Sequence, residues 1–141
     1  MKKFELTSET KINIFGKKLF RIKALISFGN VEAGETGGWV EKEENVNQSG
    51  DAWVSGNAEV YGNAEVSGNA DYTTIRGFGT QFRTTTFFRC KDKQVKVSCG
   101  CFYGTIPEFR EQVKNTRKGK IAEEYLMIAD LMEKHFAEEA K

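Results

Sequence analysis

Proline and histidine are nearly absent from this sequence. Among its 141 residues there is one proline, Pro107, and one histidine, His135, beside 14 glycines. A general base must reach a substrate proton, and a single histidine near the end of the chain is poorly suited to that task. We therefore expect no histidine-based active site. The many glycines and the lack of proline predict tight backbone turns of one repeating kind.

Long apolar runs and an excess of charge of one sign are lacking as well. No segment approaches the ~20 apolar residues that cross a membrane, and the first residues, MKKFE, lack the apolar core of a signal peptide. Basic and acidic side chains number 21 and 20, so no overall field would hold the chain on nucleic acid. We expect a cytoplasmic protein with neither a membrane nor nucleic acid as its partner.

Cysteine is scarce and odd in number, with Cys90, Cys99 and Cys101. An odd number of thiols in a chain without a secretory signal favours reduced cysteines over disulfides. Structural zinc requires four ligands, which three thiols and one remote histidine do not readily supply. Free cysteine is among the most buried residue types. We therefore expect buried thiols, no metal and no cofactor.

What the sequence does contain is an internal repeat with a period of six residues. Four units follow one another in residues 50–71, as GDAWVS, GNAEVY, GNAEVS and GNAD. The recurring apolar positions are Val54, Val60 and Val66, with alanine at Ala58, Ala64 and Ala70. A chain that turns every six residues forms a three-sided coil of about eighteen residues per turn, with Gly-Asn at its corners. The repeat predicts a short left-handed β-helix, and a meander of short strands is the alternative.

The repeat extends only a short way. Upstream, Val40 and Val46 keep the six-residue step, but two extra residues near Gln48 interrupt it before Val54. Downstream, Arg76 stands where a small inward residue is expected, so the coil should end after about Asp71. A stack of about two to three turns needs caps or a partner to bury its ends.

Two hairpins are expected beside the coil, with strands at residues 11–15 and 19–26 and at residues 84–90 and 95–102. The first hairpin would cap one end of the coil. In the second, a turn at Asp92-Lys93 would set Phe88 opposite Val97 and place all three cysteines on the same face as Phe88.

The C-terminal segment is expected to form two helices. Thr105 and Glu108 make a capping box, with Pro107 in the first turn. The second helix carries an apolar stripe, typical of a helix that lies on a sheet or against a copy of itself. We assign four stripe residues to a subunit interface: Ile121, Tyr125, Ile128 and Met132. Short hexapeptide coils commonly close as symmetric oligomers, so we expect a homo-oligomer, with a trimer favoured.

Three strings carry a family resemblance: GGWVEKEEN (37–45), GFGTQ (77–81) and VSCGCFYG (97–104). They resemble a widespread family of small phage and prophage proteins of bacteria that contain hexapeptide repeats and are often called polymer-forming. The likeness covers nearly the whole chain, and its specific element is Cys-Gly-Cys-Phe-x-Gly. It implies a β-helical, phage-encoded protein acting in the host cytoplasm, and it brings no established activity.

The chain departs from the family pattern at two places. In family members Ser-Arg follows the glycine pair and His-Gly closes the first tail helix. Here those places hold Thr80-Gln81 and Arg117-Lys118-Gly119. The resemblance therefore implies that any chemistry of that arginine and histidine is lost in this chain.

The segment after the coil is the leading candidate for a ligand site. It combines flexible glycines, a hydroxyl, an amide and a guanidinium: Gly77, Gly79, Thr80, Gln81 and Arg83. Such groups can surround an anionic or nucleotide-like ligand. The alternative is that the glycines only let the chain leave the coil.

A basic segment follows in the tail, with Arg110, Lys114, Arg117, Lys118 and Lys120. No aromatic residues interleave with these bases as they would on a nucleic-acid surface. We expect a solvated helix face that complements the helix dipole.

These features predict a mainly β fold with a capping hairpin in residues 1–30, a short hexapeptide β-helix in 31–76, a loop and second hairpin in 77–104, and two helices in 105–141. The expected function is non-enzymatic capture of a small anionic or nucleotide ligand by a phage protein, to counter a host defence signal. One alternative is binding to a host protein. A more distant alternative is an acyltransferase-like enzyme, because hexapeptide coils often carry that activity.

Overall fold

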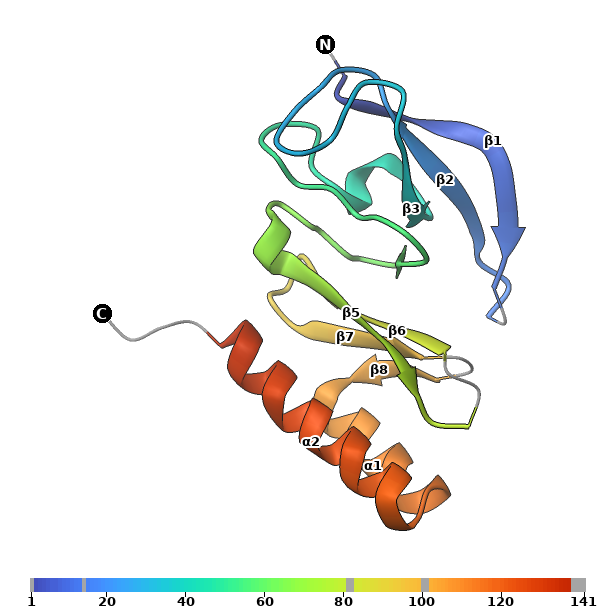
Figure 1. Ribbon diagram of the computed structural model, residues 1–141, viewed down its shortest axis with the longest axis vertical. Helices are drawn as coiled ribbons and strands as arrows, with labels where there is room; N and C mark the ends of the chain where they lie inside the picture. The colour runs from blue at the N-terminus through green and yellow to red at the C-terminus, as the bar shows by residue number, and fades with distance from the viewer. Residues whose placement is uncertain (1, 14, 81–82, 100–101, 138–141) are drawn as a thin grey trace.

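The computed structural model describes residues 2–13, 15–80, 83–99 and 102–137. They form a first sheet joined to a coil of loops, a second sheet, and a pair of helices, arranged as successive layers (Figure 1). The fold is mainly β with a two-helix C-terminal tail, as the sequence predicts. None of the helices in the described part of the chain is long and apolar enough to cross a membrane.

The first sheet begins with an antiparallel hairpin and has the strand order β1-β2-β3-β4. Its strands are β1 (Phe4–Ile12), β2 (Lys18–Ala24), β3 (Thr36–Val40) and β4 (Glu59–Val60). The hairpin turn is held by the Asn13 Oδ1, which accepts hydrogen bonds from the Phe15 and Lys17 amides, and Gly16 takes a positive φ of 78°. The expected hairpin is confirmed, and β1 begins earlier than residue 11 because Phe4 and Leu6 pack on the core.

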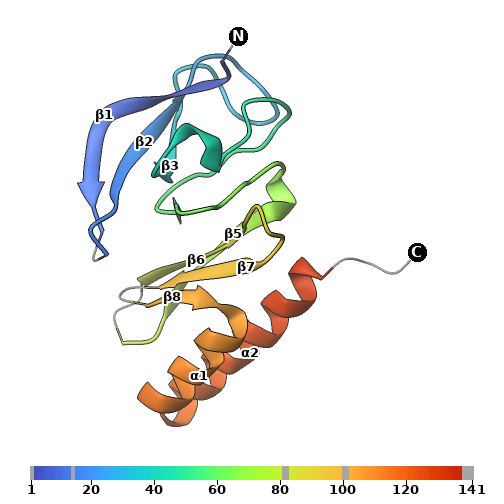
Figure 2. The same ribbon diagram turned by 180° about the vertical axis from the view of Figure 1, so that it is seen from behind.

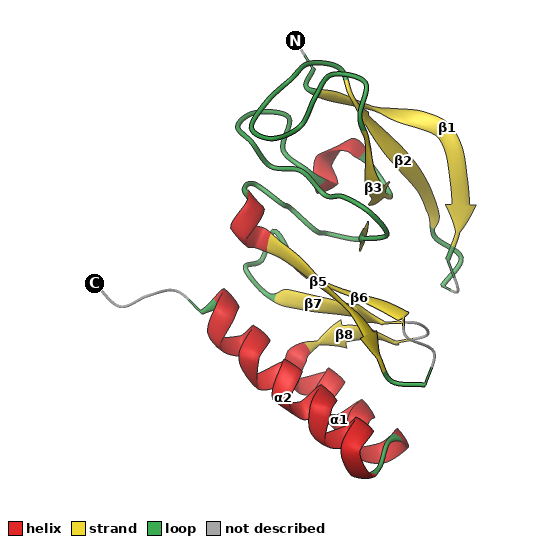
Figure 3. Ribbon diagram, in the orientation of Figure 1, coloured by secondary structure: helices red, strands yellow, loops and turns green. Residues whose placement is uncertain are grey.

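The repeat returns alongside itself in parallel. Val40 lies opposite Val60, and Val46 lies opposite Val66. The two members of each pair are separated by one coil turn of about eighteen residues, which is three hexapeptides, and by the two extra residues near Gln48. Between β3 and the second sheet the chain is mostly loop (Figure 3). In the described residues this parallel pairing is limited to β3–β4 and one bridge, so a regular left-handed β-helix is not shown.

Valines and alanines of the repeat point inward, as predicted. The fully buried set is Val40, Val46, Ala52, Val54, Ala58, Val60, Ala64 and Val66. Ala70, the last alanine of the repeat, was predicted to point inward but is exposed. It lies in the short 3-10 helix Asn69–Asp71, where the repeat ends. Glu59, which lies between the inward residues Ala58 and Val60, is half-buried and pairs with Lys11.

The glycine pair before Trp39 allows the coil to pack tightly. A Cβ on Gly37 would lie 2.6 Å from both the Trp53 ring and the Val54 carbonyl oxygen. A Cβ on Gly38 would lie 2.9 Å from the Ala58 carbonyl oxygen. Both backbone contacts leave no space for a larger residue.

The second sheet is an antiparallel meander with the strand order β5-β6-β7-β8. Its strands are β5 (Tyr72–Phe78), β6 (Arg83–Arg89), β7 (Val95–Cys99) and β8 (Phe102–Thr105). Residues 72–76, which the sequence assigned to the coil, therefore belong to this sheet. The predicted strand over 95–102 is also divided, because Cys99 of β7 pairs antiparallel with Phe102 of β8.

The register of the second hairpin differs by one residue from the prediction. Phe87, and not Phe88, lies opposite Val97. The loop has three residues, Lys91 to Lys93, because the Cys90 amide donates to the Gln94 carbonyl and Lys93 takes a positive φ of 72°. A one-residue shift sends every side chain to the opposite face. Cys90 therefore packs in the coil core and Cys99 against the helices, while Cys101 lies outside the described residues.

The tail consists of α1 (Ile106–Thr116) and α2 (Gly119–Phe136), which cover the face of the second sheet that points away from the coil (Figure 2). The capping box is confirmed: the Glu108 amide donates to the Thr105 Oγ1, and the Thr105 amide donates to the Glu108 carboxylate. Arg110 holds the two helices together by ion pairs with Asp130 and Glu133 of α2.

The apolar stripe of α2 is buried within the same chain. Tyr125, Ile128 and Met132 retain at most 8% exposure, and Ile121 packs partly against the same cluster. Sheet residues such as Phe87 and Val97 occupy this face. The assignment of these four residues to a subunit interface is therefore corrected: the stripe lies on a sheet, which was the other possibility that its pattern allowed.

Candidate functional site

A cleft lies between the end of the first hairpin and the second sheet, with a volume of about 460 Å³. We call it the interlayer cleft. It is lined by Lys11, Ile12, Asn13, Asn57, Glu59, Arg76, Arg83, Thr84, Thr86 and Ser98. These residues come from β1 and its turn, a corner of the coil and β4, and three strands of the second sheet. The stacking of the layers therefore builds the site.

Three cationic side chains and one carboxylate line the interlayer cleft. The Lys11 Nζ lies 2.7 Å from the Glu59 carboxylate and 4.5 Å from the centre of the Trp39 ring. Lys11 therefore already compensates the negative charge of Glu59. Arg76 and Arg83 form no ion pair with any described residue. Two guanidinium groups remain available for an anion.

Hydroxyl and amide groups complete the wall of the interlayer cleft. The Thr86 Oγ1 accepts a hydrogen bond from the Glu59 amide, which fixes β4 against β6. The Ser98 hydroxyl lies 2.9 Å from the Tyr61 hydroxyl, and burial raises the pKa of Tyr61, so both groups stay neutral. The buried Asn13 Nδ2 has no hydrogen-bond partner among the described residues. The cleft thus offers mostly neutral hydrogen-bonding groups around its cations.

The structure distributes the predicted ligand residues among three roles. Arg83, one of the predicted ligand residues, lines the interlayer cleft. Gly77 takes a positive φ of 98° within β5, where the pairing with β6 shifts register, and Gly79 takes one of 77° in the turn that follows. Neither glycine lines the cleft. Thr80 lines a different hollow, on the helix side of the second sheet, which we call the second hollow. Gln81 lies outside the described residues.

Two cations of the site were missed from the sequence. Arg76 carried a usable signal, because it broke the inward phase of the repeat. It lies opposite Thr84 in the β5–β6 pairing, so both reach the same face. Lys11 carried no such signal, since its position depends on how the first hairpin packs on the coil.

The other candidate groups lie apart from the interlayer cleft. His135 is exposed near the end of α2 and packs beside Phe136 at 5.0 Å. The described cysteines lie on opposite faces of the second sheet. Within the part of the chain that the structure describes, no group of three or more His, Cys, Asp or Glu residues could hold a metal ion. Of the basic tail segment, Arg110 is engaged in ion pairs and Arg117 lines the second hollow.

No protein family model matches the sequence, and no curated protein is significantly similar to it.

Proposed function

We propose that this protein binds a small anionic ligand, of the phosphate or nucleotide class, in the interlayer cleft. The observation that carries the proposal is the pair Arg76 and Arg83, two guanidinium groups without an ion pair in the described structure that line one cleft. Guanidinium groups bind phosphate oxygens through paired, charge-assisted hydrogen bonds. The hydroxyls of Thr84 and Thr86 add neutral donors beside them.

The size of the interlayer cleft supports a small molecule. Pockets for small ligands have volumes of about 300–1,000 Å³, and this cleft has about 460 Å³. The side chain of Ile12 is 72% exposed at its edge and offers an apolar surface to a non-charged part of the ligand. We propose binding without catalysis.

Titration calorimetry with inorganic pyrophosphate and with nucleoside diphosphates tests the proposal. We expect Arg76→Ala and Arg83→Ala each to weaken binding about ten- to a hundred-fold, because each removes hydrogen bonds to a charged group. Lys114→Ala is the matched control, since this exposed cation lines neither the cleft nor the second hollow. No binding of any of these anions, or equal affinity in all three variants, would overturn the proposal.

The resemblance of the sequence motifs to phage and prophage proteins supports a biological setting for this ligand. A phage protein that sequesters a nucleotide-like signal in the host cytoplasm would blunt a defence pathway that depends on that signal. Growth of phage on a signalling-proficient host, with the wild-type protein or with Arg76→Ala supplied in trans, tests this setting. Equal growth of the phage with the two proteins would contradict this setting.

A second candidate function is protein interaction, either with another copy or with a host protein. Met127 and Leu131 are 69% and 57% exposed on the outer side of α2, four residues apart and therefore adjacent on the helix. If the chain is a trimer, this pair is the available apolar surface of α2. Sedimentation of the wild type and of Met127→Glu tests this candidate: a trimer that dissociates in the variant supports it, and a wild-type monomer at micromolar concentration removes the self-association form.

We also propose that residues 38–66 form a short left-handed β-helix. The parallel pairs Val40–Val60 and Val46–Val66 and the buried inward valines support it. An experimental structure at high resolution would test the handedness of the coil. A right-handed crossover or an irregular path between the parallel pairs would contradict it.

A further inference from the structure

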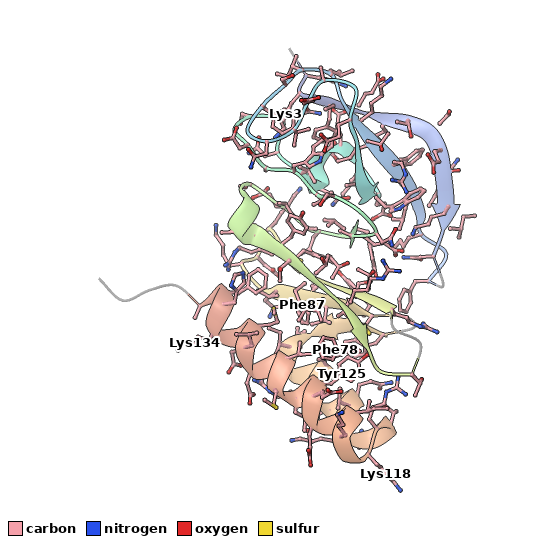
Figure 4. All side chains as sticks on the ribbon, in the orientation of Figure 1. Lys3, Phe78, Phe87, Lys118, Tyr125 and Lys134 are labelled. Atoms are coloured by element: carbon pink, nitrogen blue, oxygen red, sulfur yellow. The ribbon has the colours of Figure 1, made fainter. Side chains whose placement is uncertain are left out.

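A second hollow lies on the opposite face of the second sheet, between the β5–β6 turn and the two helices. Its volume is about 260 Å³. Its most buried lining residues are Phe109, Val113 and Tyr125. Phe78 and Phe102 are half-buried and form its sides. Figure 4 shows Phe78 and Tyr125 in the layer between the second sheet and the helices, and the two belong to one packed cluster.

The aromatic rings of this hollow are fixed by one another and by the turn. The ring of Phe109 lies 5.6 Å from that of Phe102 and 5.8 Å from that of Tyr125. A Cβ on Gly79 would come within 2.5 Å of the Tyr125 hydroxyl, so the turn closes directly over this side chain. Burial raises the pKa of Tyr125, which therefore stays protonated. The hollow is a preformed aromatic site.

The rim of the hollow is polar and cationic. Arg83 and Arg117 are both exposed at this rim, and neither forms an ion pair with a described residue. Gln112 is exposed beside them on α1 and carries an amide donor and acceptor. Flat aromatic walls below a rim with one amide and two guanidiniums suit a planar heteroaromatic ring that is attached to an anionic group.

Arg83 lines both the hollow and the interlayer cleft, because it is the first residue of β6 at the end of the sheet. One side chain therefore lies between an aromatic site and a cationic site. At about 260 Å³ the hollow is smaller than the about 300–1,000 Å³ typical of a complete ligand site. It suits one ring system, with the remainder of the ligand extending past Arg83.

We propose that the second hollow receives the base of a nucleotide whose phosphates lie along Arg83 and into the interlayer cleft. This inference rests on the proposed function and names the ligand class more narrowly, as a nucleoside di- or polyphosphate or a dinucleotide. The base stacks against Phe102, and Arg117 and Gln112 contact its polar edge or the neighbouring phosphate.

Calorimetry that compares ADP, GDP, CDP and UDP with inorganic pyrophosphate tests this inference. All five share the diphosphate, so a difference in affinity reports on the nucleoside. We expect at least one nucleotide to bind ten-fold or more tightly than pyrophosphate. Phe102→Leu, which keeps apolar volume but removes the aromatic face, should remove most of that advantage and leave pyrophosphate affinity unchanged. Arg76→Ala should weaken the binding of both nucleotide and pyrophosphate, and Lys114→Ala should weaken the binding of neither.

The possible results separate this inference from the proposal on which it rests. Equal affinity for pyrophosphate and all four nucleotides would overturn the base site while leaving the anion site intact. A nucleotide preference that persists in Phe102→Leu, Gln112→Leu and Arg117→Ala would also overturn it. Failure of every ligand, pyrophosphate included, would overturn both. As a direct structural readout, we expect nuclear Overhauser contacts between base protons and the Val113 methyl groups.

Discussion

The side chain of Asn45 connects two turns of the coil by hydrogen bonds. It is fully buried, and its Oδ1 accepts hydrogen bonds from the Glu41 and Lys42 amides. Its Nδ2 donates to the Gly62 and Ala64 carbonyl oxygens of the next turn. A single side chain therefore binds four backbone groups, of which the Glu41 amide also donates to the Val60 carbonyl oxygen, and it connects two turns that share only short strand pairing.

Replacement of Asn45 by alanine should lower the free energy of unfolding by about 2–4 kcal/mol. The reason is that the Lys42 amide and the Gly62 and Ala64 carbonyl oxygens lose these hydrogen bonds, and each unsatisfied group costs about 1–3 kcal/mol before relaxation or water entry. The measurement is urea denaturation, with Asn63→Ala as a control at an exposed asparagine of the same repeat. Equal changes in the two variants would contradict the role of Asn45.

Cys90 should make the stability of the protein depend on pH in the alkaline range. Burial, with a smaller contribution from Asp92, raises the pKa of the Cys90 thiol to about 11. In the unfolded chain a thiol ionises near pH 8.5. The unfolded state therefore loses this proton first, and the contribution of Cys90 to stability is complete below about pH 8 and is lost as the pH rises toward about 11.

Denaturation of the wild type and of Cys90→Ala between neutral and alkaline pH measures this contribution. We expect the stability advantage of the wild type over the variant to narrow as the pH rises. An advantage that stays constant would show that the thiol ionises alike in the folded and unfolded chains.

The sequence predicts the helices and strands well where its local pattern is strong. The inward phase of the repeat, the first hairpin and the capping box of α1 all follow from local patterns. β5 was missed because Tyr72 and Phe78 continue the six-residue phase of the coil, although their strand pairs with β6. The register of β6 and β7 depended on the length of one loop, and neighbouring Phe87 and Phe88 could have indicated that both faces of β6 are buried.

Val60→Asp tests the inward phase of the coil. The change places a charge in a fully buried position lined by valine and alanine, so we expect a loss of several kcal/mol in unfolding free energy. Glu65→Lys is the outward control, because Glu65 is exposed whereas Glu59 is paired with Lys11. We expect this control to change stability by less than about 0.5 kcal/mol. Thermal denaturation in which both variants melt alike would contradict the assignment.

The lining of the candidate site could be predicted from the sequence only in part. Arg83 is predicted as a ligand residue because charge, glycine and threonine cluster along the chain, and it lines the cleft. Lys11 and Arg76 belong to separate elements, and they line one cleft only because the end of the first hairpin lies next to the second sheet. No local pattern specifies that packing.

The second sheet joins two hydrophobic cores. Phe88 and Cys90 pack with the coil valines, while Phe87 and Val97 pack with the helices. Because adjacent residues of β6 belong to different cores, loss of either core removes the packing on one face of the same strand. The coil and the helices should therefore unfold as one cooperative unit.

Two probes report separately on the two ends of the molecule. Trp39 and Trp53 are both buried in the coil layer, whereas the helical signal in circular dichroism comes mainly from α1 and α2. We expect tryptophan fluorescence and circular dichroism to give coincident denaturation curves. Phe88→Ala, on the coil side, should lower the unfolding free energy by about 3–5 kcal/mol and shift both curves together. Leu131→Ala, at an exposed position of α2, is the control and should move neither curve appreciably. If Phe88→Ala shifts the fluorescence curve and leaves the helical signal in place, the two cores unfold independently and the interlayer cleft would open without loss of the helices.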